Sequence, residues 1–186
     1  SLTMSAVLTP ISLHADAAEI ERMHRLFDMQ RNAFAAAPYP DLAARKAKLR
    51  RLIDALRRYQ NEIVAAVNDD FGVRAGAETK LVEVMGPILE ARHALSHMRS
   101  WMKPRRRSTE MLFLTNSAWV EYQPKGVVGI IGTWNFPLYL TIGPLIAALA
   151  AGNRAMVKVS EFTPRTTALL RTMLSGCFAE DEVAVF

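Results

Sequence analysis

The sequence predicts an α/β protein in which N-terminal helices and a β-hairpin precede a β-α-β-α unit of a parallel sheet. The prediction depends first on Val127 to Ile131, a β-branched run without polar alternation that is typical of a strand buried on both faces. A long apolar segment with helical character separates this run from a second one, Arg154 to Val159. Strand, helix and strand in this order predict a parallel pair with a right-handed crossover.

The helices of this unit have their own boundary signals. Leu138 to Ala151 is apolar on nearly every side, which predicts a buried helix. Gly152-Asn153 is suited to end that helix, because both residues tolerate the left-handed conformation. Thr163 and Pro164 fit the N-cap and the first position of the next helix. Residues 181–186 are predicted to form a further strand.

Three amphipathic helices are expected before the hairpin, because apolar residues recur at helical spacing in residues 17–37, 42–68 and 78–98. Asp41 is the expected N-cap of the second helix. Gly86-Pro87 is expected to kink the third.

Two shorter segments are predicted from their turn-forming residues. Asn68 to Gly72 is expected to be a turn, since its two adjacent Asp residues lack the spacing of further metal ligands. Residues 111–125 are expected to contain a β-hairpin with Thr115-Asn116-Ser117 as its turn. The expected strands of this hairpin are Met111–Leu114 and Ala118–Tyr122.

Composition and charge narrow the function classes. With 186 residues, 51% of them hydrophobic and 22% charged, the chain is typical of a soluble globular protein. The basic run Lys103 to Arg107 is interrupted by Pro104 and the net charge is only +5, so nucleic-acid binding is not expected. His93 and His97 share a helix face but no HExxH pattern is present, so no metal site is expected.

Three features of the sequence bear on where the protein is found. The uncharged stretch from Gly126 to Gly152 is long enough to span a membrane, but Trp134 to Pro137 would break such a helix, so no integral span is expected. Cys177 is the only cysteine, which excludes an internal disulfide and suits a reducing compartment. The N-terminus lacks the basic start and apolar core of a signal peptide, so we expect a cytoplasmic protein.

Three short blocks in register carry a family resemblance. They are Gly132-Thr133-Trp134-Asn135-Phe136-Pro137, Ala150-Ala151-Gly152-Asn153, and Lys158-Val159-Ser160-Glu161 followed by Thr163-Pro164. In these blocks and their spacing, residues 40–186 resemble the aldehyde dehydrogenase superfamily. Asp70-Phe71-Gly72 and Trp101 to Arg106 are similar to its branch of class 3, fatty and coniferyl aldehyde dehydrogenases. Val159 departs from the family pattern, which usually has Pro at this place.

The resemblance implies the N-terminal part of an NAD(P)-dependent enzyme that oxidises an aromatic or aliphatic aldehyde, such as coniferyl or fatty aldehyde, to the carboxylic acid. It divides the chain into a helical part of the cofactor domain (1–110), a hairpin for oligomerisation (111–125) and the truncated first half of a Rossmann-like NAD-binding unit (126–186). In the family, a Cys thiolate forms a thiohemiacetal and then a thioester. That nucleophile and the general base are expected beyond Phe186, so the fragment alone is expected to be inactive.

The resemblance also assigns roles to single residues. It implies that Asn135 donates to the oxyanion, for which a non-titrating amide is chemically suited; the alternative is a structural Asn that turns the strand into the helix. Lys158 and Glu161 are implied to bind the ribose hydroxyls of NAD, with NADP also possible. Ile131, Gly132, Thr133 and Trp134 are implied to line the nicotinamide side through backbone atoms, and Ser160 to contact the cofactor.

A second interpretation belongs to another class of protein. The family's hairpin pairs with another subunit, so a homodimer is expected of a full-length enzyme. A short paralogue without catalysis could use the same hairpin purely for assembly. Alternatively, the hairpin makes no contact with another subunit and is only an edge hairpin within one chain.

Overall fold

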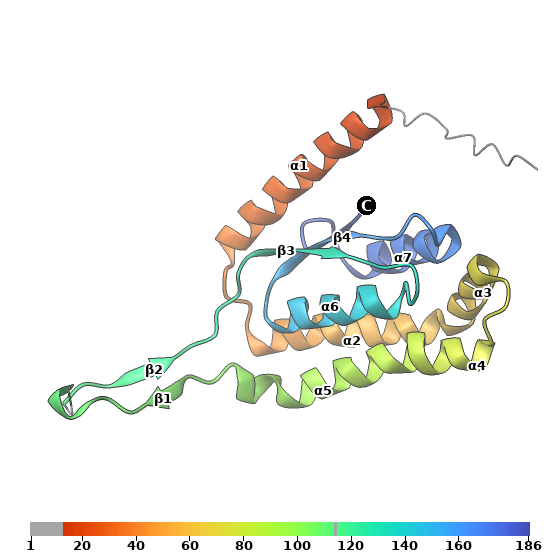
Figure 1. Ribbon diagram of the computed structural model, residues 1–186. Helices are drawn as coiled ribbons and strands as arrows, with labels where there is room; N and C mark the ends of the chain where they lie inside the picture. The colour runs from red at the N-terminus through yellow and green to blue at the C-terminus, as the bar shows by residue number, and fades with distance from the viewer. Residues whose placement is uncertain (1–12, 114) are drawn as a thin grey trace, which may run out of the picture.

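A three-stranded parallel sheet forms the centre of the computed structural model, which describes residues 13–113 and 115–186 (Figure 1). The sheet has the order β3 (Val127–Ile131), β4 (Arg154–Lys158) and β5 (Val183–Val185). Val127 pairs with Arg154, and Ala155 pairs with Val183. The predicted strand-helix-strand order is therefore confirmed, and the third strand lies within the predicted range 181–186. The prediction that Val127–Ile131 is buried on both faces was wrong, because β3 lies at the edge of the described sheet and only its Ile130 is buried.

Two layers of helix cover the sheet. The crossover helices α6 (Tyr139–Ala150) and α7 (Pro164–Cys177) lie on one face, while α1 (Leu13–Ala36) crosses the other (Figure 1). Leu26 of α1 packs with Met156, Ala184 and Phe186 in a small cluster that is separate from the main core. Gln30 fastens α1 to the sheet, because its Nε2 donates to the carbonyl oxygens of Ala155 and Glu180, each at 2.9 Å.

The main core lies between the sheet and a second group of helices. These are α2 (Leu42–Arg58), α3 (Gln60–Phe71), α4 (Gly76–Thr79) and α5 (Gly86–Trp101), with a π-helical segment from Lys80 to Met85. Burying a large apolar side chain completely stabilises the fold by about 1.5–3 kcal/mol. The largest side chains buried in this way include Leu49, Leu52, Leu56, Ile63, Met98, Leu138, Ile142, Leu145, Ile146 and Leu149.

The helix boundaries confirm one sequence signal and correct two others. Asp41 caps α2 as predicted, since its Oδ1 accepts the N–H of Ala44 at 2.7 Å. The predicted single helix 42–68 is instead divided at Tyr59 into α2 and α3. The predicted helix 78–98 contains a π-helical turn just before Gly86-Pro87, where the ring of Pro87 removes the N–H that would continue the α-helical ladder.

The prediction of the first hairpin strand was wrong. β1 is Arg105–Arg107, in the basic run, and pairs antiparallel with β2 (Ala118–Val120), with Arg105 opposite Val120. Met111–Phe113 forms a 3₁₀ turn instead of a strand, and Leu114 lies outside the described residues. All three residues of β1 are exposed, so no buried face selects an apolar sequence there, and an apolar pattern could not locate the strand.

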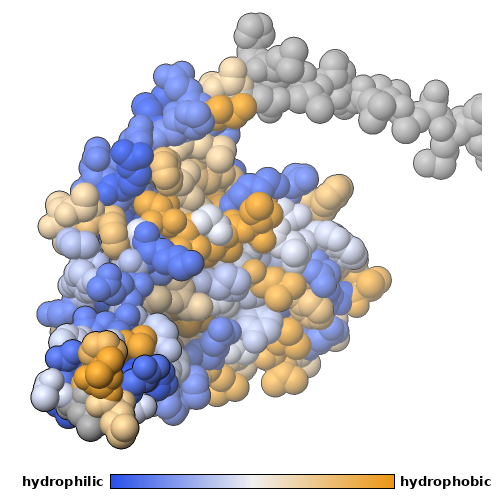
Figure 2. All heavy atoms as spheres, turned by 60° about the vertical axis from the view of Figure 1, so that its left-hand side comes forward, coloured by the Kyte–Doolittle hydropathy of each residue, from blue (hydrophilic) through white to orange (hydrophobic). Residues whose placement is uncertain are grey.

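The hairpin projects away from the rest of the molecule (Figure 1). Apolar side chains gather near its end beside hydrophilic ones (Figure 2). Met111 and Leu112 are 86% and 84% exposed. Within the described residues, no helix combines the length and hydrophobicity needed to cross a membrane.

The N-terminus of α7 is capped by a residue from a distant helix. Thr163 precedes α7 as predicted, but its side chain makes no capping bond, and its buried hydroxyl has no hydrogen-bond partner among the described residues. Instead the carboxylate of Asp70 accepts the N–H groups of Arg165 at 2.9 Å and Thr166 at 2.8 Å. The prediction of a turn over Asn68–Gly72 was therefore wrong for Asn68–Phe71, which belong to α3, and only Gly72, with φ 74°, follows the helix.

This arrangement predicts that Asp70→Ala is the damaging change at the start of α7. Loss of a helix cap should lower the free energy of unfolding by about 1 kcal/mol. Thr163→Val should leave it unchanged or slightly higher, because it removes a buried hydroxyl without a partner while keeping its shape. Urea denaturation of both variants measures the difference, and a larger loss in Thr163→Val would contradict the assignment.

Candidate functional site

The carboxyl ends of β3 and β4 lie side by side, and the polar residues predicted from the sequence gather there. The N–H of Gly132 donates to the carbonyl oxygen of Lys158 at 2.8 Å, which extends the pairing one residue beyond β3. Thr133 and Asn135 follow β3, while Lys158 ends β4. Ligands of open parallel sheets bind at this edge.

Gly132 is required by close packing. A Cβ atom there would lie 2.3 Å from Oγ1 of Thr141, a distance that real Cβ atoms do not show. The Thr141 hydroxyl itself donates to the carbonyl oxygen of Pro137 at 2.6 Å. The end of β3 therefore lies directly against the first turn of α6, and residues 133–138 form a tight connection between them.

The side-chain amide of Asn135 has a defined orientation. The hydroxyl of Thr133 donates to Oδ1 of Asn135 at 2.8 Å. With its oxygen engaged in this way, the exposed amide keeps Nδ2 as its hydrogen-bond donor. This arrangement offers a neutral donor at the strand end.

A buried carboxylate holds the other side of this connection. Glu83, in the π-helical segment, has an exposed fraction of 0%, and its Oε2 accepts the N–H groups of Leu138 and Tyr139, each at 2.9 Å. Its Oε1 accepts Nη1 of Arg74 at 3.0 Å. Burial raises the pKa of Glu83, although the hydrogen bonds from Tyr139 and Leu138 and the guanidinium of Arg74 act in the opposite direction.

Arg74 links this carboxylate to Asn135. Its Nη2 donates to the backbone carbonyl oxygen of Asn135 at 2.8 Å. The guanidinium carbon lies 3.9 Å from the ring centre of Phe71 and 4.9 Å from that of Phe136. The two Nη atoms of the Arg74 guanidinium therefore link the turn after β3 to Glu83 in the π-helical segment.

Sequence reasoning missed both Arg74 and Glu83. A usable signal existed for Glu83, because it lies four residues before Pro87 and eight before Ala91, on the face that the helix buries. A charged residue at a buried position calls for partners. Arg74 follows a glycine turn, and nothing in its local sequence marks it.

Lys158 and Glu161 form an exposed ion pair after β4. Nζ of Lys158 lies 2.5 Å from Oε2 of Glu161, and this hydrogen bond lowers the pKa of the Glu161 carboxyl. Ser160 differs from them because it is buried, with its Oγ accepting the N–H of Phe162 at 3.3 Å. The structure therefore brings Lys158 and Glu161 together at the surface and turns Ser160 inward.

Apolar side chains surround the same edge. Ile131 at the end of β3 is 78% exposed, and Phe162 after β4 is 73% exposed. Trp134 is exposed as well. Large exposed apolar groups beside convergent polar ones mark a surface that another molecule or segment covers.

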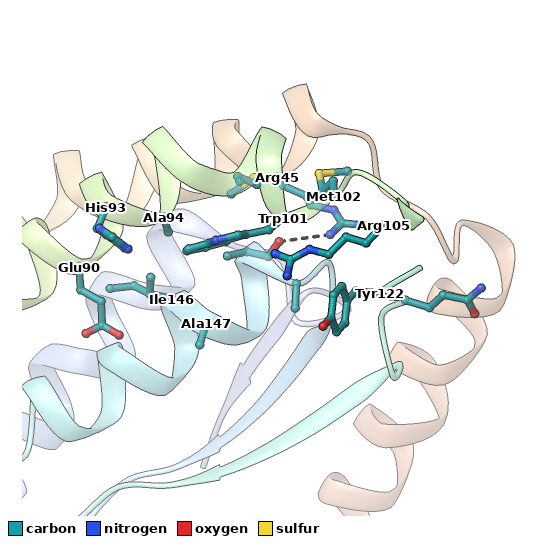
Figure 3. A pocket seen from close by; sticks show the side chains of 14 residues that line it. Arg45, Glu90, His93, Ala94, Trp101, Met102, Arg105, Tyr122, Ile146 and Ala147 are labelled. Carbon is teal, nitrogen blue, oxygen red and sulfur yellow. Dashed lines mark hydrogen bonds between the residues drawn. The ribbon is translucent and has the colours of Figure 1, made fainter. Parts of the chain in front are cut away.

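A hollow of about 480 Å³ lies elsewhere, between α5, α6 and the base of the hairpin (Figure 3). Its walls include Trp101 and Tyr122. Arg45 is bound into its floor, since Nε donates to the carbonyl oxygen of Pro40 at 2.8 Å and Nη1 to that of Ala150 at 3.2 Å. Burial lowers the pKa of Arg45. The residues that line this hollow differ from those predicted for the site.

The two histidines share a helix face as predicted. His93 and His97 stack with ring centres 4.1 Å apart, and Trp101 continues the stack at 5.9 Å from His97. In the part of the chain that the structure describes, residues of the metal-binding types do not form a cluster of three or more.

Cys177 lies at the other end of α7 from the strand edge. Its thiol is half-buried, with Sγ 3.9 Å from the carbonyl oxygen of Arg51. Burial raises the pKa of this thiol, which opposes the thiolate that a nucleophile needs. The interpretation of Cys177 as a structural thiol agrees with these surroundings.

The sequence profile of the aldehyde dehydrogenase family matches residues 8–184. The chain belongs to the aldehyde dehydrogenase family. A Pseudomonas aeruginosa protein named as a probable coniferyl aldehyde dehydrogenase is 46% identical over 167 residues, which are 90% of this chain and 35% of that protein. The coniferyl aldehyde dehydrogenase of a Pseudomonas species is 38% identical over 163 residues, 88% of this chain and 34% of that protein.

Solved structures of aldehyde dehydrogenases have the same fold. The substrate-bound Staphylococcus aureus AldH superposes with a TM-score of 0.84 at 25% identity, over 88% of this chain and 36% of that one. Succinic semialdehyde dehydrogenase from Streptococcus pyogenes, solved with NADP⁺, gives a TM-score of 0.77 at 18% identity, over 88% of this chain and 35% of that one. The chain thus spans about a third of the length of these relatives.

The raised pKa of Cys177 predicts slow alkylation. At pH 8 a thiol with a raised pKa holds less thiolate than free cysteine, so iodoacetamide should modify Cys177 several-fold more slowly. The rate should rise to that of free cysteine when urea unfolds the chain. Mass spectrometry of the timed reaction measures both rates, and alkylation as fast as free cysteine in the folded protein would refute the prediction.

Proposed function

We propose that this chain supplies the oxyanion donor and the adenosine-ribose contacts of an NAD-dependent enzyme that oxidises an aldehyde to the carboxylic acid. The observation that carries the proposal is the oriented amide of Asn135 beside the Lys158–Glu161 pair, at the ends of two adjacent parallel strands. Asn135 fits as the catalytic donor, and the other residues bind or orient.

The amide of Asn135 suits the stabilisation of an oxyanion. Attack on an aldehyde places negative charge on the carbonyl oxygen, and a donor already in position lowers the barrier because it need not reorganise. Thr133 engages Oδ1, so Nδ2 is the atom that would face the developing charge. An amide stays neutral at every physiological pH, so this donor needs no particular protonation state.

The residues present fit the adenosine ribose of a nicotinamide dinucleotide. Lys158 offers donors and Glu161 offers acceptors to a pair of neighbouring hydroxyls, and both side chains are exposed at the end of β4. When bound, the dinucleotide supplies the oxidising equivalents of the reaction. The carboxylate of Glu161 would repel a 2′-phosphate, which favours NAD over NADP. Ile131, Gly132, Thr133 and Trp134 would line the nicotinamide side, and Ser160 would support the turn from within.

The thiol nucleophile is assigned to a residue other than Cys177. Cys177 is the only cysteine of the 186 residues, and its raised pKa and its position at the far end of α7 do not suit attack on an aldehyde at the strand edge. We therefore place the nucleophile and the general base outside this chain segment, and we expect residues 1–186 alone to be inactive.

The substrate and assembly are part of the same proposal. The names of two relatives favour an aromatic aldehyde of the coniferyl type, with a fatty aldehyde as the alternative. The projecting hairpin, with its exposed apolar end, suits pairing with a second copy in a homodimer. The single half-buried thiol suits a reducing, cytoplasmic location.

The hairpin also favours a second candidate function. An exposed apolar hairpin end would serve a non-catalytic assembly protein equally well. The two candidates differ at Asn135, which matters for turnover only in the enzyme.

Replacing Asn135 tests the oxyanion role. In the full-length protein, Asn135→Ala should lower kcat for an aromatic aldehyde roughly a hundredfold or more, which is the effect expected for losing one oxyanion donor. The affinity for NAD should change less than twofold. Asn61→Ala, on the exposed surface of α3, is the matched control and should keep full turnover. Unchanged kcat in Asn135→Ala, with chemistry rate-limiting, would return Asn135 to a structural role.

Replacing Lys158 and Glu161 tests the cofactor contacts. Lys158→Met should weaken NAD binding by roughly tenfold to a hundredfold, the loss expected for a charge-assisted hydrogen bond. Lys125→Met, at the opposite end of β3, is the control. Glu161→Gln should raise NADP affinity relative to NAD, because a negative charge near the 2′-phosphate is removed. Calorimetric titration measures these affinities, and an unchanged NAD affinity in Lys158→Met would exclude the proposed contact.

A further inference from the structure

Two charged residues bind the connection from β3 to α6 on the side away from the polar residues at the strand ends. Glu83 binds the first N–H groups of α6, and Arg74 binds the backbone carbonyl of Asn135. Neither residue is among those that surround the exposed amide. Both come from the segment between α3 and α5, and so from another layer of the fold.

We propose that Arg74, held in place by Glu83, is a positioning residue that fixes Asn135 for its role as hydrogen-bond donor, an inference that rests on the proposed function. The pair acts on the backbone of the turn and leaves the Asn135 side chain free. The pair therefore determines the backbone position of Asn135, while the hydroxyl of Thr133 determines the orientation of its side-chain amide.

The geometry of the guanidinium supports this role. Nη1 binds Oε1 of Glu83 at 3.0 Å and Nη2 binds the carbonyl oxygen of Asn135 at 2.8 Å, so one rigid planar group spans both. The rings of Phe71 and Phe136 pack against the guanidinium. Phe136 is the neighbour of Asn135, and Arg74 therefore contacts the turn at two consecutive residues.

Glu83 makes the anchor rigid. Its carboxylate is fully buried and accepts three donors, two from the backbone of α6 and one from Arg74. A buried charge with satisfied partners cannot move without breaking them, since water is not at hand to replace them. The position of Asn135 relative to the start of α6 is thus defined through Arg74.

The position of Asn135 should affect the rate of the catalysed reaction. Displacing a catalytic group by about 1 Å can lower turnover about a hundredfold, because the stabilisation of the transition state depends on alignment. The proposed ribose contacts, Lys158 and Glu161, pair with each other at the end of β4, while the carbonyl oxygen of Asn135 accepts from Arg74. A change in the Arg74–Glu83 pair should therefore lower kcat and leave the affinity for NAD nearly unchanged.

Arg74→Lys separates positioning from capping. A lysine can still pair with Glu83, so the cap of α6 is kept, but a single ammonium cannot bridge to the carbonyl of Asn135 with a planar fork. In the full-length protein, kcat should fall about tenfold or more, while KM for NAD should stay within twofold of the wild-type value. Exchange of the Leu140 amide, which donates to the carbonyl oxygen of Phe136 at 3.0 Å, should become at least fivefold faster, while exchange in α2 should stay as in the wild type.

Asp41→Ala is the matched control. It removes a helix cap from α2, far from the turn, and should lower stability without changing kcat. A loss of kcat in Asp41→Ala equal to that in Arg74→Lys would show that turnover follows stability, and the positioning role would be overturned.

The exchange measurement keeps this inference distinct from the proposed function. If the wild-type protein oxidises no aldehyde, the proposed function fails, but faster exchange of the Leu140 amide in Arg74→Lys, with α2 unchanged, would still support the anchor. Unchanged kcat in an active enzyme, or unchanged exchange in any case, would overturn it.

Discussion

The arrangement of the turn after β3 depends on the hydrogen bonds that the buried carboxylate of Glu83 accepts. An anion with no exposed surface would be unfavourable by several kcal/mol without partners, and here it has three donors from two other parts of the chain. Two of these are N–H groups at the start of α6, where a negative charge is also favoured by the helix dipole. The carboxylate therefore serves as an N-cap supplied from another helix, and it holds the π-helical segment, α6 and the turn after β3 in one arrangement.

The same kind of long-range polar contact recurs throughout the fold. Asp70 of α3 caps α7, and Gln30 of α1 binds two carbonyl groups at the sheet. Oδ1 of Asn153 accepts the N–H groups of Lys125 and Gly126, at 2.7 and 3.0 Å, where the chain enters β3. Apolar burial supplies most of the stability, but it is non-directional. These polar contacts decide how each helix end sits relative to a strand.

This division explains how the proposed catalytic donor can lie on a turn and still have a defined position. The proposed donor is exposed, as access to substrate requires, and so its side chain gains little from packing. Its position comes instead from the backbone: Gly132 allows the strand end to lie against Thr141, and Arg74 holds the following carbonyl. The exposed Lys158–Glu161 pair lies at the end of the adjacent strand, so the proposed donor and the proposed cofactor contacts share one sheet edge but are anchored separately.

The sequence by itself determined the β-α-β-α order, the strands at Val127–Ile131 and from Arg154 onward, and the family, because continuous apolar runs, the long apolar helix between them and short residue blocks are all local in the chain. Asp41 was found in the same way, since it caps its own helix within three residues. Only the tertiary structure decided that Asp70, and not Thr163, caps α7, that β1 lies in the basic run, and that Arg74 and Glu83 hold Asn135. These contacts join residues far apart in the chain or lie on exposed strands, so local propensity and periodicity carry no information about them.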